Sequence, residues 1–150
     1  MAGKAKDLNT LIRLHKWTVD EKQRALVALQ RREDELILFG EAQEAQMRRE
    51  QALVSADLTG LAGLSLGHYL LAYRRRREQL AATLAALRVE IEAARDALAE
   101  AYRTLKVTEE VQTSRANAEQ AERDQKERDM LDDIGQIQHR RRQHRDEDSE

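Results

Sequence analysis

The chain has 150 residues, no proline and no cysteine, and a formal net charge of −2, with 36% charged and 3% aromatic residues. Its size corresponds to one domain, and the lack of proline favours long uninterrupted helices, because each interior proline would cost about 3 kcal/mol. With so few aromatic residues, burial must follow a narrow coiled-coil seam. The composition excludes disulfides, thiolate catalysis and cysteine-based zinc sites, and the near-neutral charge argues against a dedicated nucleic-acid binder.

The first residues, MAGKAKDLNT, lack the apolar core of a signal peptide. No stretch approaches the about 18 uninterrupted apolar residues that a membrane span needs. We therefore expect a cytoplasmic protein that makes no direct membrane insertion.

A long first helix is predicted from residue 8 to residue 54. Spacings of four and three residues alternate along it, which is the pattern of a coiled-coil seam. Apolar side chains hold most of these positions, and polar ones leave the seam imperfect. The positions are Leu8, Ile12, His15, Val19, Lys22, Leu26, Leu29, Glu33, Leu36, Gly40, Gln43, Met47, Glu50 and Val54.

The glycine-containing stretch SADLTGLAGLSLGHY follows the first helix and predicts a turn near residue 62, within residues 57–65. Ser65 is expected to cap the second helix by accepting a backbone N–H of its first turn. The second seam is cleaner than the first. Its positions are Leu66, Leu70, Tyr73, Arg77, Leu80, Leu84, Leu87, Ile91, Ala94, Leu98, Ala101 and Leu105.

Two helices joined by one turn predict an all-α fold, a long antiparallel two-helix coiled-coil hairpin. If residue i faces roughly residue 124 − i, Val19 meets Leu105, and Leu8 faces the chain near residue 116. The sequence then divides into a hairpin, residues 1–116, and a C-terminal helical extension with a frayed charged tail, residues 117–150. The C-terminal helix extends beyond the N-terminus because nothing remains to pair with it.

The first part of this extension, NAEQAERDQKERD, is expected to be an exposed helix. Oppositely charged side chains four residues apart stabilise isolated helices. Glu119 with Arg123 and Asp124 with Arg128 are such pairs.

Four apolar residues then return in DMLDDIGQIQHRRR at the spacing of one helical face. A helix with one apolar face commonly fills a groove of another protein. Self-association or folding back onto the hairpin would also cover the face, although Asp132, Asp133 and Gly135 interrupt it and argue against a strong dimer seam. The four residues are Met130, Leu131, Ile134 and Ile137.

The most conspicuous basic run is Arg74 to Arg77. Successive helix residues rotate by about 100°, so these arginines point to all sides and cannot form one phosphate-binding patch. They are either solvated side chains along the seam or contacts for an acidic protein. Phe39, Tyr69 and Tyr73 lie toward the same end, where they either form a binding hot spot or fill a thin part of the seam.

No catalytic or metal-binding constellation is recognisable. No two histidines are spaced three or four residues apart, as a helical metal site needs. The sequence also lacks a P-loop and a nucleophile beside a base. We expect no enzymatic activity, no cofactor and no metal. The histidines are His15, His68, His139 and His144.

Four segments in order resemble the flagellar export protein FliJ and its counterparts in type III secretion, the YscO group. They are LNTLIRLHKWTVDEKQRALVAL, LSLGHYLLAYRRRREQL, AYRTLKVTEEV and ERDMLDDIGQIQHRRR. The most distinctive pieces are Lys106 followed by Glu109, and Asp132–Asp133 before an apolar residue and an arginine cluster. The thin aromatic content of the first helix and Arg77 in a seam position depart from the family pattern.

The resemblance implies a hairpin like the central stalk of rotary ATPases. In that family the end formed by both termini enters the pore of a hexameric export ATPase and promotes its assembly and activity. The other end reaches the membrane export gate, and the protein also handles export chaperones. We expect ATPase binding by Arg13, Lys16, Met130, Leu131, Ile134, Ile137, Arg140, Arg141 and Arg142. We expect gate binding by Phe39, Tyr69, Tyr73, Arg74, Arg75 and Arg76.

A stalk of this kind should be monomeric when alone. The main alternative is a homodimeric scaffolding coiled coil, which a mass measurement would distinguish. A weaker alternative is a nucleic-acid-binding helical arm, whose binding would fall steeply with added salt.

Overall fold

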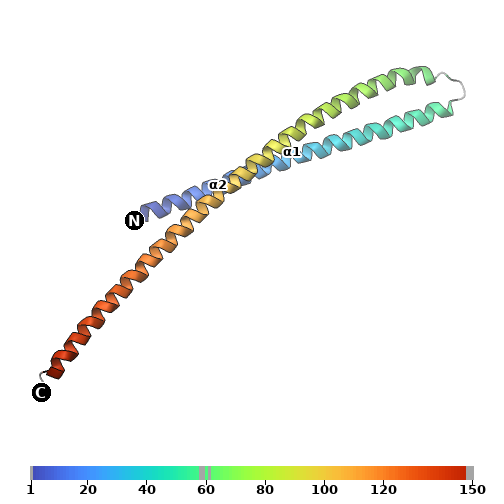
Figure 1. Ribbon diagram of the computed structural model, residues 1–150. Coiled ribbons are helices and arrows are strands. Elements are labelled where there is room, and N and C mark those ends of the chain that lie inside the picture. Colours follow the sequence, from blue (N-terminus) through green and yellow to red (C-terminus); the bar gives the residue numbers. More distant parts are fainter. Residues whose placement is uncertain (1, 58–59, 61, 148–150) are drawn as a thin grey trace. The chain divides into compact units, whose positions relative to one another are not determined.

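The computed structural model describes residues 2–57, 60 and 62–147. They form two α-helices, α1 (Ala2–Ala56) and α2 (Ala62–Glu147), and no strand occurs among them. The helices pack against each other as an all-α hairpin (Figure 1), as the sequence predicts. Within these residues, neither helix contains a stretch apolar enough over sufficient length to cross a membrane.

The chain separates into two compact units. The terminal unit consists of Met1–Arg13 and Leu105–Glu150, and the turn unit consists of Leu14–Thr104. The predicted boundary between residues 116 and 117 falls inside the terminal unit.

The core is a narrow seam in each unit. Val19, Met47, Leu87 and Ile91 are buried in the turn unit. In the terminal unit the buried side chains are those of Ile12, Leu105 and Thr108. The predicted seam positions are buried or partly covered, with two exceptions, Lys22 and Arg77, which are exposed. Both carry a charged side chain, which is costly to remove from water.

The helices meet in a register three residues from the predicted one. Arg88 Nε lies 2.7 Å from Glu33 Oε1 in the turn unit, and Gln112 Nε2 donates a hydrogen bond to Asn9 Oδ1 in the terminal unit. The residue numbers of both pairs add up to 121, whereas the predicted register requires 124. Within each unit the helices are therefore displaced by about one helical turn from the predicted register.

The turn lies where the sequence predicts it, between Ala56 and Ala62. Gly60 has a φ of +72°, a left-handed conformation that glycine adopts without the steric cost of a Cβ. The expected capping role of Ser65 is wrong, because α2 begins three residues earlier and Ser65 lies inside the helix.

Candidate functional site

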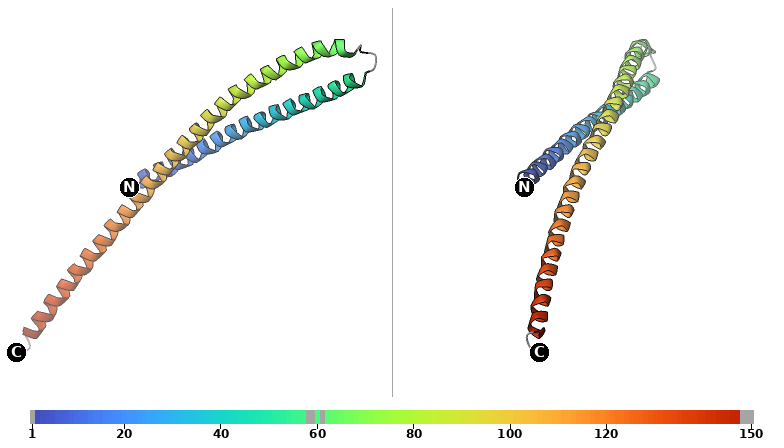
Figure 2. Two further views of the ribbon diagram at one scale, coloured as in Figure 1. Left: turned by 45° about the vertical axis from the view of Figure 1, so that its right-hand side comes forward. Right: turned by 60° about the vertical axis from the view of Figure 1, so that its left-hand side comes forward.

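The C-terminal part of α2 is an uncovered helix within the terminal unit. Every side chain from residue 113 to residue 142 is exposed, and Figures 1 and 2 show a single ribbon there, running on beyond the N-terminal segment of α1. We call residues 113–147 the extension. The prediction of an unpaired C-terminal helix is confirmed, and pairing ends a few residues earlier than the predicted start of the extension at residue 117.

The extension carries the predicted apolar face. Met130 and Leu131 are each 67% exposed, and Ile134 and Ile137 are 49% and 48% exposed. No other part of the described chain covers them. The apolar face is defined by these four residues.

Pairing stops because the seam changes chemistry. From Arg115 to Asp133, the alternating four- and three-residue spacing of the α2 seam falls on charged residues only. A partner helix on this line would have to desolvate each charge, which costs more than an exposed ion pair returns. Met130, Ile134 and Ile137 of the apolar face each lie one residue after a position of this spacing, a rotation of about 100° around the helix. The charged seam positions are Arg115, Glu119, Glu122, Lys126, Asp129 and Asp133.

Local bonds one turn apart support the unpaired helix. Lys126 Nζ lies 2.7 Å from Glu122 Oε1, and this hydrogen bond, together with the ammonium charge, lowers the pKa of Glu122. Gln120 Nε2 donates to Asp124 Oδ1 at 2.7 Å. Pairs one turn apart stabilise an isolated helix.

The two predicted charge pairs use different atoms than expected. Arg123 Nε donates to the main-chain oxygen of Glu119 at 3.3 Å, and Arg128 Nε donates to the main-chain oxygen of Asp124 at 3.2 Å. Each arginine therefore bonds to the helix backbone one turn back, in place of the predicted side-chain ion pair.

The basic residues predicted to bind an ATPase do not all lie near the apolar face. Arg140, Arg141 and Arg142 follow it on the same helix and are exposed. The register places Arg13 level with Thr108, 22 residues before Met130, which corresponds to about 33 Å of helix. Lys16 is exposed and belongs to the turn unit.

The predicted gate-binding residues are also only partly brought together. Tyr69 and Tyr73 are partly covered, and the guanidinium carbon of Arg76 lies 5.8 Å from the centre of the Tyr69 ring. Arg74 and Arg75 are exposed nearby. Phe39 is 54% exposed, but the register places it level with residue 82, away from the tyrosines.

Tyr73 fills the seam, which is one of the two roles that the sequence allows for it. It lines a cavity of about 220 Å³ between α1 and α2, together with Gly40, Gln43, Arg77 and Leu80. At this point the helices approach so closely that a Cβ added to Gly40 would lie 2.8 Å from Leu80 Cδ2.

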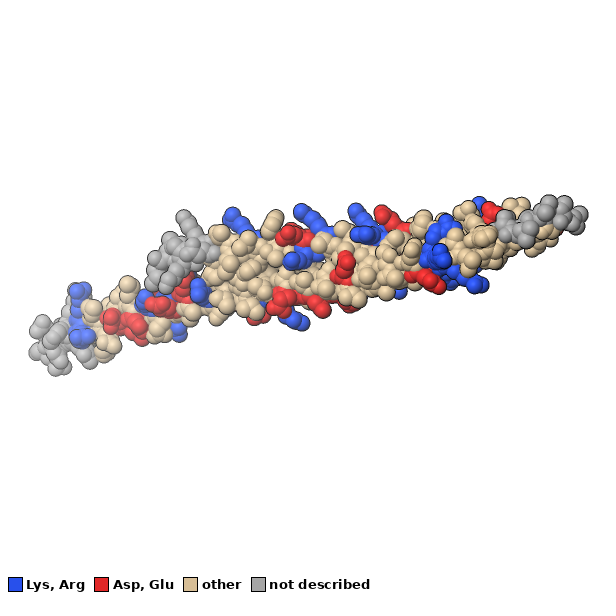
Figure 3. Space-filling view, turned by 90° about the horizontal axis from the view of Figure 1, so that it is seen from above, with Lys and Arg blue, Asp and Glu red and all other residues tan. Residues whose placement is uncertain are grey.

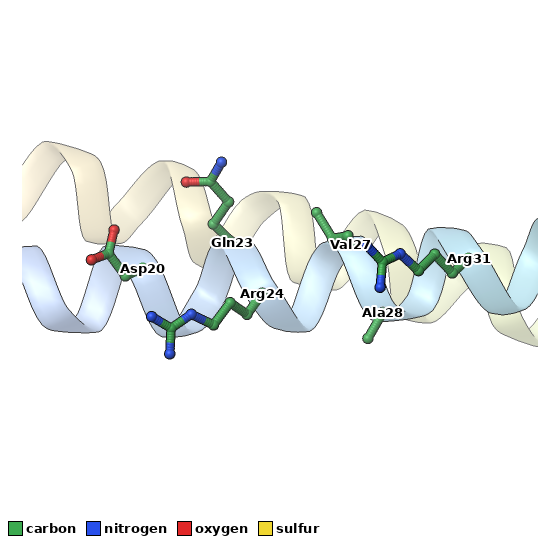
Figure 4. Close-up of a pocket in the computed structure, with 6 residues that line it drawn as sticks. All are labelled: Asp20, Gln23, Arg24, Val27, Ala28 and Arg31. Carbon is green, nitrogen blue, oxygen red and sulfur yellow. The ribbon is translucent and has the colours of Figure 1, made fainter.

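A shallow groove on the outer side of α1 is lined by that helix alone. Figure 4 shows Asp20, Gln23, Arg24, Val27 and Arg31 along one stretch of the helix. The volume of about 480 Å³ lies between side chains on a convex surface. Ligand-binding sites are normally concave and enclosing, so this groove offers a small molecule little contact.

The described residues contain no group of three or more His, Cys, Asp or Glu placed to hold a metal ion. His15 is a partly covered seam residue, and His68 and His139 are exposed.

Trp17, the only tryptophan, is 59% exposed on α1, and the sequence pattern does not single it out as a site residue. Trp17 lies two residues after the seam position His15 and two before the seam position Val19. The periodicity therefore predicts that its side chain points away from the seam.

Comparisons with protein-family models, with curated proteins and with solved structures find no match. The likeness to the FliJ and YscO group is therefore carried by the sequence segments alone.

Proposed function

We propose that this chain is a FliJ-like, central-stalk-like component of a flagellar or type III protein-export ATPase complex. In this role the extension binds in the pore of the ATPase hexamer and promotes its assembly and activity. The turn unit links the ATPase to the membrane export gate, and export chaperones are further partners. The protein would act in the cytoplasm, peripherally associated with the export apparatus, and would not itself be an enzyme.

The observation that carries this proposal is the uncovered apolar face. Full burial of a large aliphatic side chain contributes about 1.5–3 kcal/mol. The four residues of the face are between 48% and 67% exposed, so covering them would contribute roughly 3.5–7 kcal/mol in total.

This gain is comparable to the lower end of the cost of associating two molecules, which is about 4–15 kcal/mol. A single partner helix along the face would therefore bind weakly. A pore built from several subunits contacts the charged sides of the extension as well, which favours a ring-shaped partner over a second helix. Arg140, Arg141 and Arg142 would steer the extension toward an acidic pore entrance.

The proposal is tested by ATP hydrolysis of the export ATPase from the same organism. Four proteins are compared: the full chain, a chain ending at residue 116, the variant Ile134→Asp with Ile137→Asp, and a control. The control is Val89→Asp with Val107→Asp, two exposed residues of α2 outside the extension (71% and 60% exposed).

We expect the full chain and the control to stimulate hydrolysis, and the truncated chain and the isoleucine variant to lose stimulation and ATPase binding. Helicity measured by circular dichroism should be unchanged in both aspartate variants. Normal stimulation by the isoleucine variant would refute the role of the apolar face.

A homodimeric scaffolding coiled coil remains the second candidate, because Met130, Ile134 and Ile137 follow the alternating four- and three-residue spacing of a coiled-coil seam. Light scattering distinguishes the two. A monomeric mass of 17.3 kDa supports the stalk, and twice that mass, lost in the isoleucine variant, supports the scaffold.

A further inference from the structure

The turn end of the hairpin, residues 51–73, is nearly free of charge. Asp57 is its one acidic residue, His68 is its one histidine, and it contains no lysine or arginine. The chain as a whole is 36% charged. Among the described side chains of this stretch, Leu53 is 67% exposed and Leu71 is 56% exposed.

An arginine belt lies directly behind this uncharged end. The register of the turn unit places Arg48 and Arg49 level with residues 73 and 72, next to the run on α2. All six arginines are exposed. Figure 3 shows Lys and Arg side chains gathered near this end of the molecule. The belt consists of Arg48, Arg49, Arg74, Arg75, Arg76 and Arg77.

The arginines outnumber the acidic residues around them. Glu44 pairs with Arg48 at 2.7 Å, and Glu50 and Glu78 are the other carboxylates at this level. The belt therefore keeps an excess of positive charge.

The arginines form a ring and not a patch. Four successive residues of α2 point in four directions, because each is rotated by about 100° from the last. Arg48 and Arg49 add two further directions from α1. A flat protein surface could contact the arginines on only one side of such a ring. A layer of anions that surrounds the turn end could contact all of them.

We propose that the turn end docks onto a bilayer surface rich in anionic lipid, with the arginine belt at the level of the lipid phosphates. Arginine pairs with phosphate through two parallel hydrogen bonds, and each basic residue near an anionic surface adds about fivefold to binding. Leu53 and Leu71 enter the interface. Tyr69, which stacks with Arg76, lies where membrane-bound proteins concentrate tyrosine.

The dimensions fit shallow docking. From Arg48 to the end of α1 at Ala56 are eight residues, about 12 Å of helix, and from the start of α2 at Ala62 to Arg74 are twelve, about 18 Å. Interfacial segments bury their apolar part about 5–10 Å deep, and the arginine side chains span the remainder. Docking of this kind does not require a helix that crosses the membrane.

The inference does not rest on the proposed function, since binding to lipid needs neither the ATPase nor the extension. It is tested by flotation of the full chain with vesicles of phosphatidylcholine alone, or with about one third phosphatidylglycerol. The charge variant is R74Q/R75Q/R76Q. The matched control is R140Q/R141Q/R142Q, which removes the same charge from the extension.

We expect binding to the anionic vesicles only, and a loss of about 100-fold in the charge variant, since three arginines each contribute about fivefold. The control should bind within about fivefold of the unchanged chain. Equal binding to neutral vesicles, or an equal loss in both variants, would overturn the proposal. Binding to polyglutamate but not to vesicles would also overturn it, and would identify an acidic protein as the partner.

A second pair of variants tests entry of the apolar side chains. Leu53→Ser with Leu71→Ser should weaken vesicle binding, whereas Leu38→Ser with Val89→Ser, at positions 63% and 71% exposed elsewhere in the turn unit, should not. In a Trp17→Phe background, emission of a Leu71→Trp variant should shift to shorter wavelength on anionic vesicles. An unchanged spectrum would contradict docking by the turn end.

Discussion

Replacing Gly40 by alanine sets two effects of similar size against each other. In a helix interior, alanine is about 1 kcal/mol more favourable than glycine. A Cβ at this position would lie 2.8 Å from Leu80 Cδ2, well inside the about 3.5 Å of an ordinary carbon contact, so the leucine must move. Overpacking costs about 1–3 kcal/mol. Leu80 borders the cavity of about 220 Å³, so its displaced end has space and the cost should lie near 1 kcal/mol.

The free energy of unfolding should therefore change by less than about 0.5 kcal/mol in Gly40→Ala. Gly67 lies in α2 of the same unit, and a Cβ there meets nothing within 4 Å. Gly67→Ala should thus raise the stability by the full helical gain of about 1 kcal/mol. In a Leu80→Ala background the added Cβ at position 40 has room, and Gly40→Ala should also give this full gain.

Urea denaturation followed by circular dichroism measures these differences, and the double-mutant cycle isolates the contact between positions 40 and 80. If Gly40→Ala stabilises the unchanged chain as much as Gly67→Ala does, and shows no coupling to Leu80→Ala, the close approach of the two helices at this point is refuted.

Two further results are expected. Ile91→Ala, at a position only 3% exposed, should lower the free energy of unfolding by about 2–4 kcal/mol, whereas Val89→Ala, 71% exposed, should change it by less than about 0.5 kcal/mol; equal effects in thermal unfolding would contradict the assigned seam. Lys126 lowers the pKa of Glu122 from 4.5, so this bond stabilises the helix above that pH and is lost as the pH falls through the lowered pKa. In Lys126→Gln the pKa of Glu122 should rise toward its ordinary value in a carboxyl NMR titration, and an unchanged titration would exclude the contact.

The sequence predicts which faces of the helices are covered, because an alternating four- and three-residue spacing of apolar side chains is typical of a seam between two helices. It predicts their register less well. Sliding one helix by about one turn superimposes one set of seam positions on the other, so periodicity alone leaves several registers equivalent. The choice is made by particular contacts, the approach of Gly40 to Leu80 and the pair formed by Glu33 and Arg88.

In the candidate sites, too, the exposure of residues is predictable from the sequence, whereas features that depend on the register are not. The exposure of Met130 and Ile134 is predictable, since charged residues occupy the seam positions from Arg115 to Asp133. The separation of Phe39 from Tyr69 is not predictable from the pattern, because it depends on the register. The register also brings Arg48 level with the arginines of α2. The run Arg74 to Arg77 alone does not predict that Arg48 belongs to the belt.

Each unit departs from a regular coiled coil at one place, and the departures are of opposite kinds. In the terminal unit, Arg115, Glu119 and Glu122 occupy positions where the seam would continue, so a partner helix would have to bury charge. The extension therefore stays exposed unless a partner protein covers its apolar face, which is rotated away from the seam positions. In the turn unit, Asp57 is the one Asp, Glu, Lys or Arg over residues 51–73, and the arginine belt adjoins this stretch. The nearly uncharged end, with the arginine belt behind it, suits a partner that has an apolar interior and an anionic surface. A lipid bilayer has both, whereas a single helix does not.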